Sequence, residues 1–298
     1  MTNLAGVWAA VVTPLDEADA PNAALALGYY RDLLQRGCHG VNVLGTTGEA
    51  MSFGAAQRMR FMEAVAESGL PTHTLMVGTG AAAPADAARL TRCAFECDFA
   101  AALVMPPFFF RDATDDGIVA FFDAVFAKTD PPRRRVLLYN FPRMSGIAFH
   151  PDLVTRLLAE FPGVIAGMKD SSNDATLQSE LRSRHPELVL FPGSESDLLS
   201  AKARGVSGCI SGSVALWPGL ARRAFDDGDE WLAATLTQAR AVLDGFAFIP
   251  AVRYLIAKER NDASWARPLT PLRALSREQG TALAAAAAPF LATGANRP

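Results

Sequence analysis

The sequence predicts a fold of the α/β class, a TIM (β/α)8 barrel followed by a C-terminal helical extension. Three observations lead to this prediction: eight short apolar runs, helical patterns between them, and a final segment that is helical throughout. A chain of 298 residues has room for such a barrel, which typically needs about 250 residues. We place the catalytic barrel at residues 1–227 and a helical region packed on it at residues 228–298.

The eight runs are nearly continuous in apolar character, which is typical of strands buried on both faces of a parallel sheet. In chain order they are Gly6–Thr13, Gly40–Gly45, His73–Gly78, Ala101–Met105, Arg135–Tyr139, Val164–Lys169, Leu188–Phe191 and Gly208–Ser211. Helical periodicity lies between them at Asn22–Gln35, Ala55–Ala66, Ala85–Phe95, Asp115–Phe126 and Asp152–Glu160. A doubly wound open sheet is the alternative, but no Gly-x-Gly-x-x-Gly follows the first run.

The residues after the eighth unit predict three helices, at Asp229–Leu243, Phe248–Arg260 and Ser276–Ala288, with Pro289 following the third. Several apolar side chains in this region could pack it onto the barrel or onto a neighbouring subunit. They are Phe246, Phe248, Ile249, Trp265 and Leu269.

Composition narrows the class of protein. The formal charge is −3 and no run of basic residues occurs, so the sequence does not predict binding to nucleic acid or to acidic lipid. No stretch reaches the roughly 20 apolar residues that a membrane helix needs, and Met1–Thr13 lacks the pattern of a signal peptide. The four cysteines show no zinc-site spacing. We therefore expect a cytoplasmic protein with reduced thiols.

In a barrel of this kind the site lies at the carboxyl ends of the strands. Lys169 is the one lysine that ends an apolar run; Lys128, Lys202 and Lys258 fall in helical patterns. A desolvated lysine amine is a nucleophile for carbonyl carbon. The alternative is a structural ion pair with Asp170 or another nearby carboxylate, and position alone does not separate the two.

Two further elements end predicted strands. Tyr139 is the one tyrosine at a strand end, and its phenol can donate and accept a proton beside a neighbouring strand. The turn Gly45–Glu49 has the sequence Gly-Thr-Thr-Gly-Glu, and its hydroxyl and amide donors can hold a carboxylate. A core tyrosine and an ordinary strand-to-helix turn are the alternatives.

Together these motifs resemble the dihydrodipicolinate synthase and N-acetylneuraminate lyase family, over nearly the whole chain. The resemblance rests on four segments in order. They are Ala10–Pro14, Gly45–Glu49, Tyr139–Pro142 with Ser145-Gly146, and Gly167–Ser171.

The resemblance implies class I aldolase chemistry on pyruvate or a pyruvate-yielding 2-oxo acid, without metal or organic cofactor, in a tetramer or dimer. Lys169 matches the Schiff-base lysine and Tyr139 the general acid/base. Thr46 and Thr47 match the pair that binds the 2-oxo acid carboxylate and relays protons, with Gly48 beside them. Ile210 matches a backbone contact to pyruvate, and Gly193, Ser194 and Glu195 fall near the loop that reads the rest of the substrate.

The chain departs from this family's lysine-pathway synthase at two places. Met144 stands where that enzyme has an arginine that binds the aldehyde substrate, and Arg143 comes one residue early. We still expect Arg143 to be a substrate-binding residue. Phe108–Phe110 stand where many relatives have a relay tyrosine. These departures favour a lyase or aldolase, for example of a deoxy sugar acid, over 4-hydroxy-tetrahydrodipicolinate synthase proper.

Other functions stay open at this point: a dehydratase using the same imine, or a barrel that binds a 2-oxo acid without turnover. A metal-dependent barrel is disfavoured, because no His/Asp/Glu cluster falls at the strand ends. His73 opens a strand, and His39, His150 and His185 fall in turns, where a solvated role is expected.

Overall fold

The computed structural model describes residues 4–129, 131–132, 135–196 and 198–291. Eight parallel strands pair in the order β7-β6-β5-β4-β3-β2-β1-β8. Their bounds are β1 Gly6–Ala10, β2 Gly40–Val43, β3 Leu75–Gly78, β4 Ala101–Val104, β5 Val136–Asn140, β6 Ile165–Asp170, β7 Val189–Pro192 and β8 Gly208–Ser211. The Ser207 amide donates to the Leu190 carbonyl at 2.8 Å, which draws β8 against β7. The barrel is nearly closed, and the predicted fold is confirmed.

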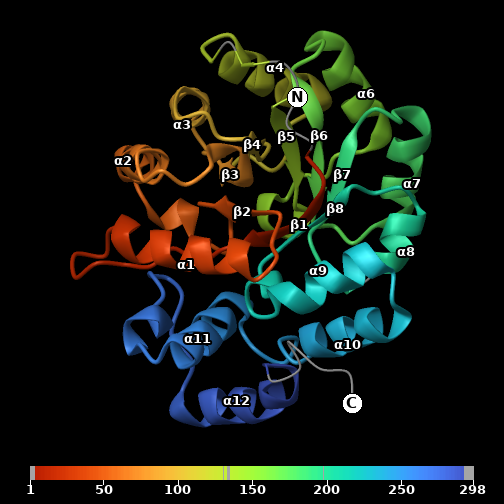
Figure 1. Ribbon diagram of the computed structural model, residues 1–298. Coiled ribbons are helices and arrows are strands. Elements are labelled where there is room, and N and C mark those ends of the chain that lie inside the picture. The colour runs from red at the N-terminus through yellow and green to blue at the C-terminus, as the bar shows by residue number, and fades with distance from the viewer. Residues whose placement is uncertain (1–3, 130, 133–134, 197, 292–298) are drawn as a thin grey trace.

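Helices cover the outside of the barrel (Figure 1). They are α1 Ala23–Gln35, α2 Ala55–Ala66, α3 Pro84–Glu96, α4 Asp115–Phe126, α6 Pro151–Glu160, α7 Ala175–Arg184, α8 Leu198–Ala203 and α9 Pro218–Asp227. The short helix α5 Pro142–Ser145 lies instead in the loop that follows β5. Among the described residues, no helix is long and apolar enough to span a bilayer. The predicted strand at His73 begins later, because Thr72–Thr74 form a 3-10 turn before β3.

Strand side chains divide between the barrel interior and the layer beneath the helices. One buried cluster contains strand residues such as Leu137, Tyr139 and Ile210 and draws on no α-helix, so it fills the interior. Val136 and Leu138 belong instead to a cluster shared with the surrounding helices. Alternation along β5 therefore aims Tyr139 inward.

A bulge on β6 is what aims Lys169 into the same interior. Val136 pairs with Ile165, but the next residue, Leu137, pairs with Gly167, so Ala166 is an extra residue. Ile165 lies in the outer cluster, and strict alternation would put Lys169 on that same side. The extra residue reverses the alternation, and Lys169 pairs with Tyr139. Bulges commonly re-aim side chains next to functional sites.

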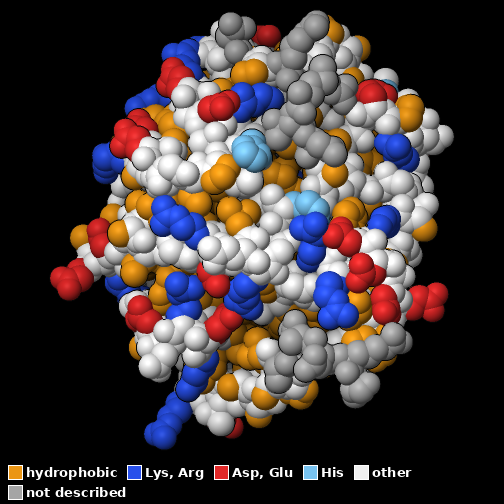
Figure 2. Space-filling view, viewed as in Figure 1, with side chains coloured by type: hydrophobic (Ala, Val, Ile, Leu, Met, Phe, Trp, Pro, Cys, Tyr) orange, Lys and Arg blue, Asp and Glu red, His pale blue; other side chains and the backbone are white. Residues whose placement is uncertain are grey.

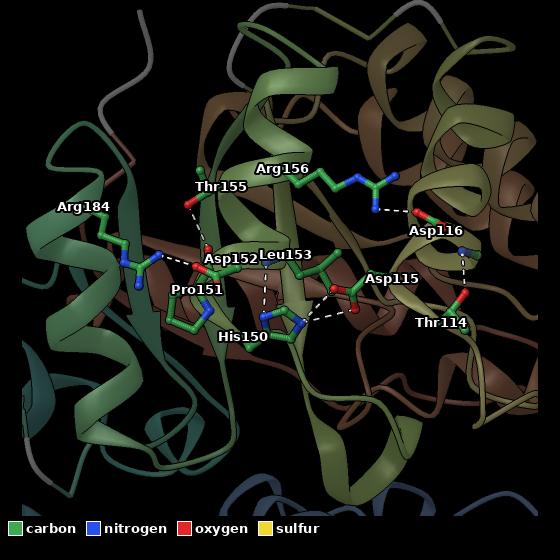
Figure 3. A network of polar contacts seen from close by, with 11 residues as sticks. Thr114, Asp115, Asp116, His150, Pro151, Asp152, Leu153, Thr155, Arg156 and Arg184 are labelled. Carbon is green, nitrogen blue, oxygen red and sulfur yellow. Dashed lines mark hydrogen bonds and ion pairs between the residues drawn. The ribbon is translucent and has the colours of Figure 1, made fainter.

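Polar contacts link the helices α4, α6 and α7 on the outside of the barrel (Figure 3). His150 caps α6, because its Nδ1 accepts the Leu153 amide at 3.3 Å, and its Nε2 contacts Asp115 of α4 at 3.1 Å. Arg184 of α7 pairs with Asp152 of α6 at 2.5 Å. Exposed pairs of this kind contribute little to stability, so they align the helices more than they stabilise them.

The C-terminal region forms α10 Glu230–Ala241, α11 Phe248–Arg260 and α12 Arg277–Leu291. In Figure 1, α11 lies below α1, α10 lies below α9, and α12 lies beneath them and contacts both. The predicted end of the last helix at Ala288 is wrong, because α12 continues through Pro289. Leu283 and Ala287 are buried in the large core and Phe290 packs against it. This packing holds the last turn of the helix beyond the proline.

Candidate functional site

A cavity of about 470 Å³ opens among loops that follow the carboxyl ends of the strands. It is where reactive side chains were expected, because those loops build the sites of such barrels. Several residues predicted for the site line it, from different strands. They are Thr46, Thr47, Tyr139, Arg143, Lys169, Gly193, Ser194 and Ile210.

Lys169 and Tyr139 form the centre of the cavity. The Lys169 Nζ lies 4.5 Å from the centroid of the Tyr139 ring, and the two side chains are only 4% and 5% exposed. The Tyr139 hydroxyl lies 3.1 Å from Thr46 Oγ1, within hydrogen-bond distance. A nucleophilic amine, a phenol and a hydroxyl thus stand in sequence, which is an arrangement that can attack a carbonyl and move its protons.

The structure shows no structural ion pair at Lys169: among the described residues, no carboxylate pairs with this amine. Asp170 is fully engaged elsewhere. Its Oδ1 accepts from Asn140 Nδ2 at 2.8 Å and from Ser172 Oγ at 2.6 Å, and its Oδ2 accepts from Gln178 Nε2 at 2.8 Å. Hydrogen bonds to the ionised form stabilise this buried carboxylate without a cation, which leaves the lysine amine available.

The Gly45–Glu49 turn supplies the hydroxyls on the other side of the cavity. Thr47 is 7% exposed, and a Cβ on Gly212 would lie 2.8 Å from its Oγ1, so this glycine lets the turn approach β8. Gly48 is not among the lining residues. Its carbonyl accepts from Thr13 Oγ1 at 2.8 Å, and it supports the turn from behind.

A buried ion pair connects this turn to the C-terminal region. Arg253 of α11 is fully buried, and its Nε donates to Glu49 Oε1 while its Nη2 donates to the Thr13 carbonyl at 2.7 Å. The second oxygen of Glu49 accepts the Leu269 amide at 2.7 Å. Burial lowers the pKa of Arg253, and Glu49 opposes that shift. The predicted packing residue Trp265 is buried next to the pair, and its carbonyl accepts from Arg253 Nη1.

The far side of the cavity comes from β7 and β8. Gly193 is required there, since a Cβ would lie 2.2 Å from Ser171 Oγ. Glu195, expected near the substrate loop, is 1% exposed, absent from the lining, and accepts from Trp217 Nε1 at 3.3 Å. Burial raises the pKa of Cys209 well above its ordinary value, so this thiol beside Ile210 stays neutral and is no competing nucleophile.

Sequence reasoning missed the wall that the C-terminal region contributes. It is formed by Arg240, Ala247, Phe248, Ile249, Pro250 and Leu272. The apolar pattern around Phe248 indicated packing, and nothing in it distinguished a cavity wall from a core. The Phe108–Phe110 segment lies outside the lining, with Phe109 and Phe110 75% and 71% exposed.

Within the described part of the chain, no group of three or more His, Cys, Asp or Glu side chains could hold a metal ion.

Comparison with known proteins fits this geometry. Residues 3–286 match the Dihydrodipicolinate synthetase family. The chain belongs to this family. Family members include lyases, and the chain is such an enzyme. It is 34% identical to a protein named "Uncharacterized DapA-like lyase" from Chloroflexus aurantiacus, over 94% of this chain and 95% of that one. It is 28% identical to N-acetylneuraminate lyase of Escherichia coli, over 82% of each chain.

A solved structure in the same family shows the same architecture. Dihydrodipicolinate synthase from Agrobacterium tumefaciens superposes with a TM-score of 0.88 at 30% identity, covering 94% of this chain and 97% of that one. The relatives thus carry both the synthase and the lyase names, so family membership leaves the substrate of this chain to be argued from its own residues.

Proposed function

We propose that the protein is a Schiff-base-forming lyase or aldolase that acts on pyruvate or a pyruvate-yielding 2-oxo acid, such as a deoxy sugar acid. One observation carries the proposal: the Lys169 amine is buried at a strand end, free of any ion pair to a described residue, and 4.5 Å from the Tyr139 ring. A structural lysine that is buried to this degree is expected to have a paired carboxylate.

The proposed reaction follows from charge. Lys169 Nζ attacks the C2 carbonyl of the 2-oxo acid, and loss of water gives an iminium that withdraws electrons from C3. Tyr139 accepts the proton of the C4 hydroxyl, the C3–C4 bond breaks, and an aldehyde leaves. The resulting enamine takes up a proton at C3, and water then releases pyruvate and the free amine.

The remaining lining residues bind and orient in this scheme. Thr46 and Thr47 hold the carboxylate beside C2 with the backbone at Ile210, which aims the carbonyl at the amine. Thr46 also connects to Tyr139 through their 3.1 Å contact and relays its proton. Gly193 and Ser194 lie where the substrate extends beyond C4. Gly48 has a supporting role, because it holds the threonine turn against Thr13.

The experiment that tests this function is a panel of 3-deoxy-2-oxo sugar acids read out by release of pyruvate. We expect at least one substrate to be cleaved, and Lys169→Arg to abolish the release. Lys202→Arg is the matched control, because it changes an exposed lysine on α8. Absence of release from every acid in the panel, with pyruvate still bound, would instead support a binding protein without turnover.

We further propose a homotetramer or dimer in the cytoplasm. The exposed rings of Phe109 and Phe110, whose centroids lie 5.2 Å apart, give an apolar surface that a second copy can cover. The four cysteines are free thiols, as expected in a reducing compartment. Light scattering of the native protein and of Phe109→Ser/Phe110→Ser tests the assembly, which the double substitution should weaken.

A further inference from the structure

The charge of the cavity is one-sided. Three cationic side chains line it, Lys169, Arg143 and Arg240, and no acidic side chain of the described residues does. Lys169 is assigned to the imine, and the threonine turn to the first carboxylate of the substrate. The proposed reaction therefore assigns no step to Arg143 or Arg240. The cavity that they line would attract further negative charge.

The Arg240 guanidinium is held in place by its surroundings. It lies in the last turn of α10, stacks over the Phe248 ring at 4.8 Å, and has a side chain only 22% exposed. Its helix is tied to the loop after β7, because Thr237 Oγ1 donates to the Ser196 carbonyl at 2.5 Å. Figure 2 shows many arginine and lysine side chains spread over the surface, whereas Arg240 borders a cavity.

The hydrogen-bond state of Arg240 points to a ligand. Nη1 pairs with Asp244 Oδ1 at 2.8 Å. Nε, on the edge of the guanidinium that also carries Nη2, is buried and has no hydrogen-bond partner. Leaving a buried donor without a partner is unfavourable, so a ligand that accepts a hydrogen bond from this edge would be stabilised.

Arg240 also marks where the cavity continues. A second hollow of about 350 Å³ shares Asn173, Ser194 and Arg240 with the main cavity. Its other polar walls are Gln178, Ser196, Arg204 and Asp244. A substrate bound through an imine at Lys169 can extend toward this polar hollow. Its far end would then lie beside the Arg240 guanidinium, which borders both hollows.

We propose that Arg240 binds a carboxylate at the far end of the substrate, so that the substrate class is a 2-oxo diacid. This inference rests on the proposed imine chemistry at Lys169. Two donors on one guanidinium edge match the two oxygens of a carboxylate. A phosphate has a third oxygen and more charge, and Asp244 already neutralises part of this arginine. Arg143 is the rival, but it is exposed on the short helix α5.

The test uses pairs of 2-oxo acids that differ only in the terminal group. 2-Oxoadipate and 2-oxohexanoate have equal chain length, and 2-oxoglutarate and 2-oxopimelate with their monoacid counterparts vary the reach. Each is trapped by borohydride, and the concentration that gives half-maximal adduct at Lys169 is measured by mass spectrometry. We expect the wild type to prefer one diacid over its monoacid by roughly ten- to a hundredfold, the range of a charged hydrogen-bond pair.

Substitutions assign that preference to a residue. Arg240→Gln should bring the ratio of the two half-maximal concentrations close to one, and Arg240→Lys should restore part of it. Arg156→Gln is the matched control for losing one positive charge, since Arg156 pairs with Asp116 on the outer surface, and it should keep the wild-type ratio. Arg143→Gln should keep most of it.

The possible results distinguish a failure of the Arg240 site from a failure of the imine chemistry at Lys169. If the wild type forms no adduct with pyruvate or any 2-oxo acid, the imine chemistry is wrong and this proposal fails with it. If adducts form but the ratio is unchanged in Arg240→Gln, the imine chemistry stands and the Arg240 site is overturned. Loss of the ratio in Arg143→Gln alone would assign the carboxylate to Arg143, and that result also overturns the proposal.

Discussion

Replacing Arg253 by methionine should destabilise the protein and loosen its threonine turn together. Arg253 joins α11 to the Gly45–Glu49 turn through Glu49, and it also donates to the carbonyls of Thr13 and Trp265. Methionine fills a similar volume and makes none of these hydrogen bonds. The Glu49 carboxylate would then be buried with one described partner, the Leu269 amide.

The magnitude follows from the burial of both partners, whose side chains are 0% and 1% exposed. Removing one member of a buried ion pair costs about 3–5 kcal/mol. Against a typical total of about 5–15 kcal/mol, the variant keeps a positive free energy of unfolding at 25 °C wherever the wild type exceeds about 5 kcal/mol. The loss corresponds to a fall in Tm of about 6–20 °C, at roughly 2–4 °C per kcal/mol.

Urea unfolding at one fixed protein concentration measures this loss, because assembly would otherwise shift the midpoint. The control is the double variant Glu49→Gln/Arg253→Met, which buries no uncompensated charge. It should recover at least half of the stability lost by Arg253→Met alone. A single variant that loses less than about 1 kcal/mol, or a double variant less stable than the single one, would refute the reasoning.

Three other predictions follow from the same structure. Tyr139→Phe keeps the ring and removes the hydroxyl, so kcat for pyruvate release should fall by about 10²–10⁴; a variant above half of wild-type turnover would contradict the role. Gly167→Ala places a Cβ 1.8 Å from the Val189 carbonyl oxygen. It should lower the free energy of unfolding in urea by at least about 1–3 kcal/mol and slow the trapping of pyruvate. The control Gly28→Ala has nothing near its new Cβ and should leave both unchanged. Burial lowers the pKa of His39, so the unfolded chain binds the proton more readily than the folded one. The free energy of unfolding should therefore be fully retained above about pH 6.5 and fall below it, and it should fall less in His39→Gln. The same dependence on pH in both proteins would show that His39 is not responsible.

The barrel and the centre of its site were accessible from sequence for a physical reason. Buried parallel strands read as apolar runs, and a reactive side chain at the end of such a run stands out against them. Lys169, Tyr139, Thr46 and Thr47 were found in this way, and the structure brings them to one cavity. Their chemical roles stay predictions.

Other features of the site depend on contacts that no local pattern carries. Strict alternation of side chains from Ile165 would have placed Lys169 on the outer face of the strand. Only the pairing with β5 reveals the bulge at Ala166 that places it inside. Glu195 follows a strand end, yet packing against Trp217 turns it away from the cavity. Arg240 lies on a helix beyond the barrel, where an arginine at the last turn is ordinary in sequence.

The most direct test of the central claim is a borohydride trap with saturating pyruvate, read by peptide mass spectrometry. The account predicts one reduced pyruvyl group on the peptide that contains Lys169, and none on those with Lys128, Lys202 or Lys258. Prior substitution of Lys169 by arginine should remove the adduct. An unmodified Lys169 in the wild type, or an adduct on another lysine alone, would contradict the account.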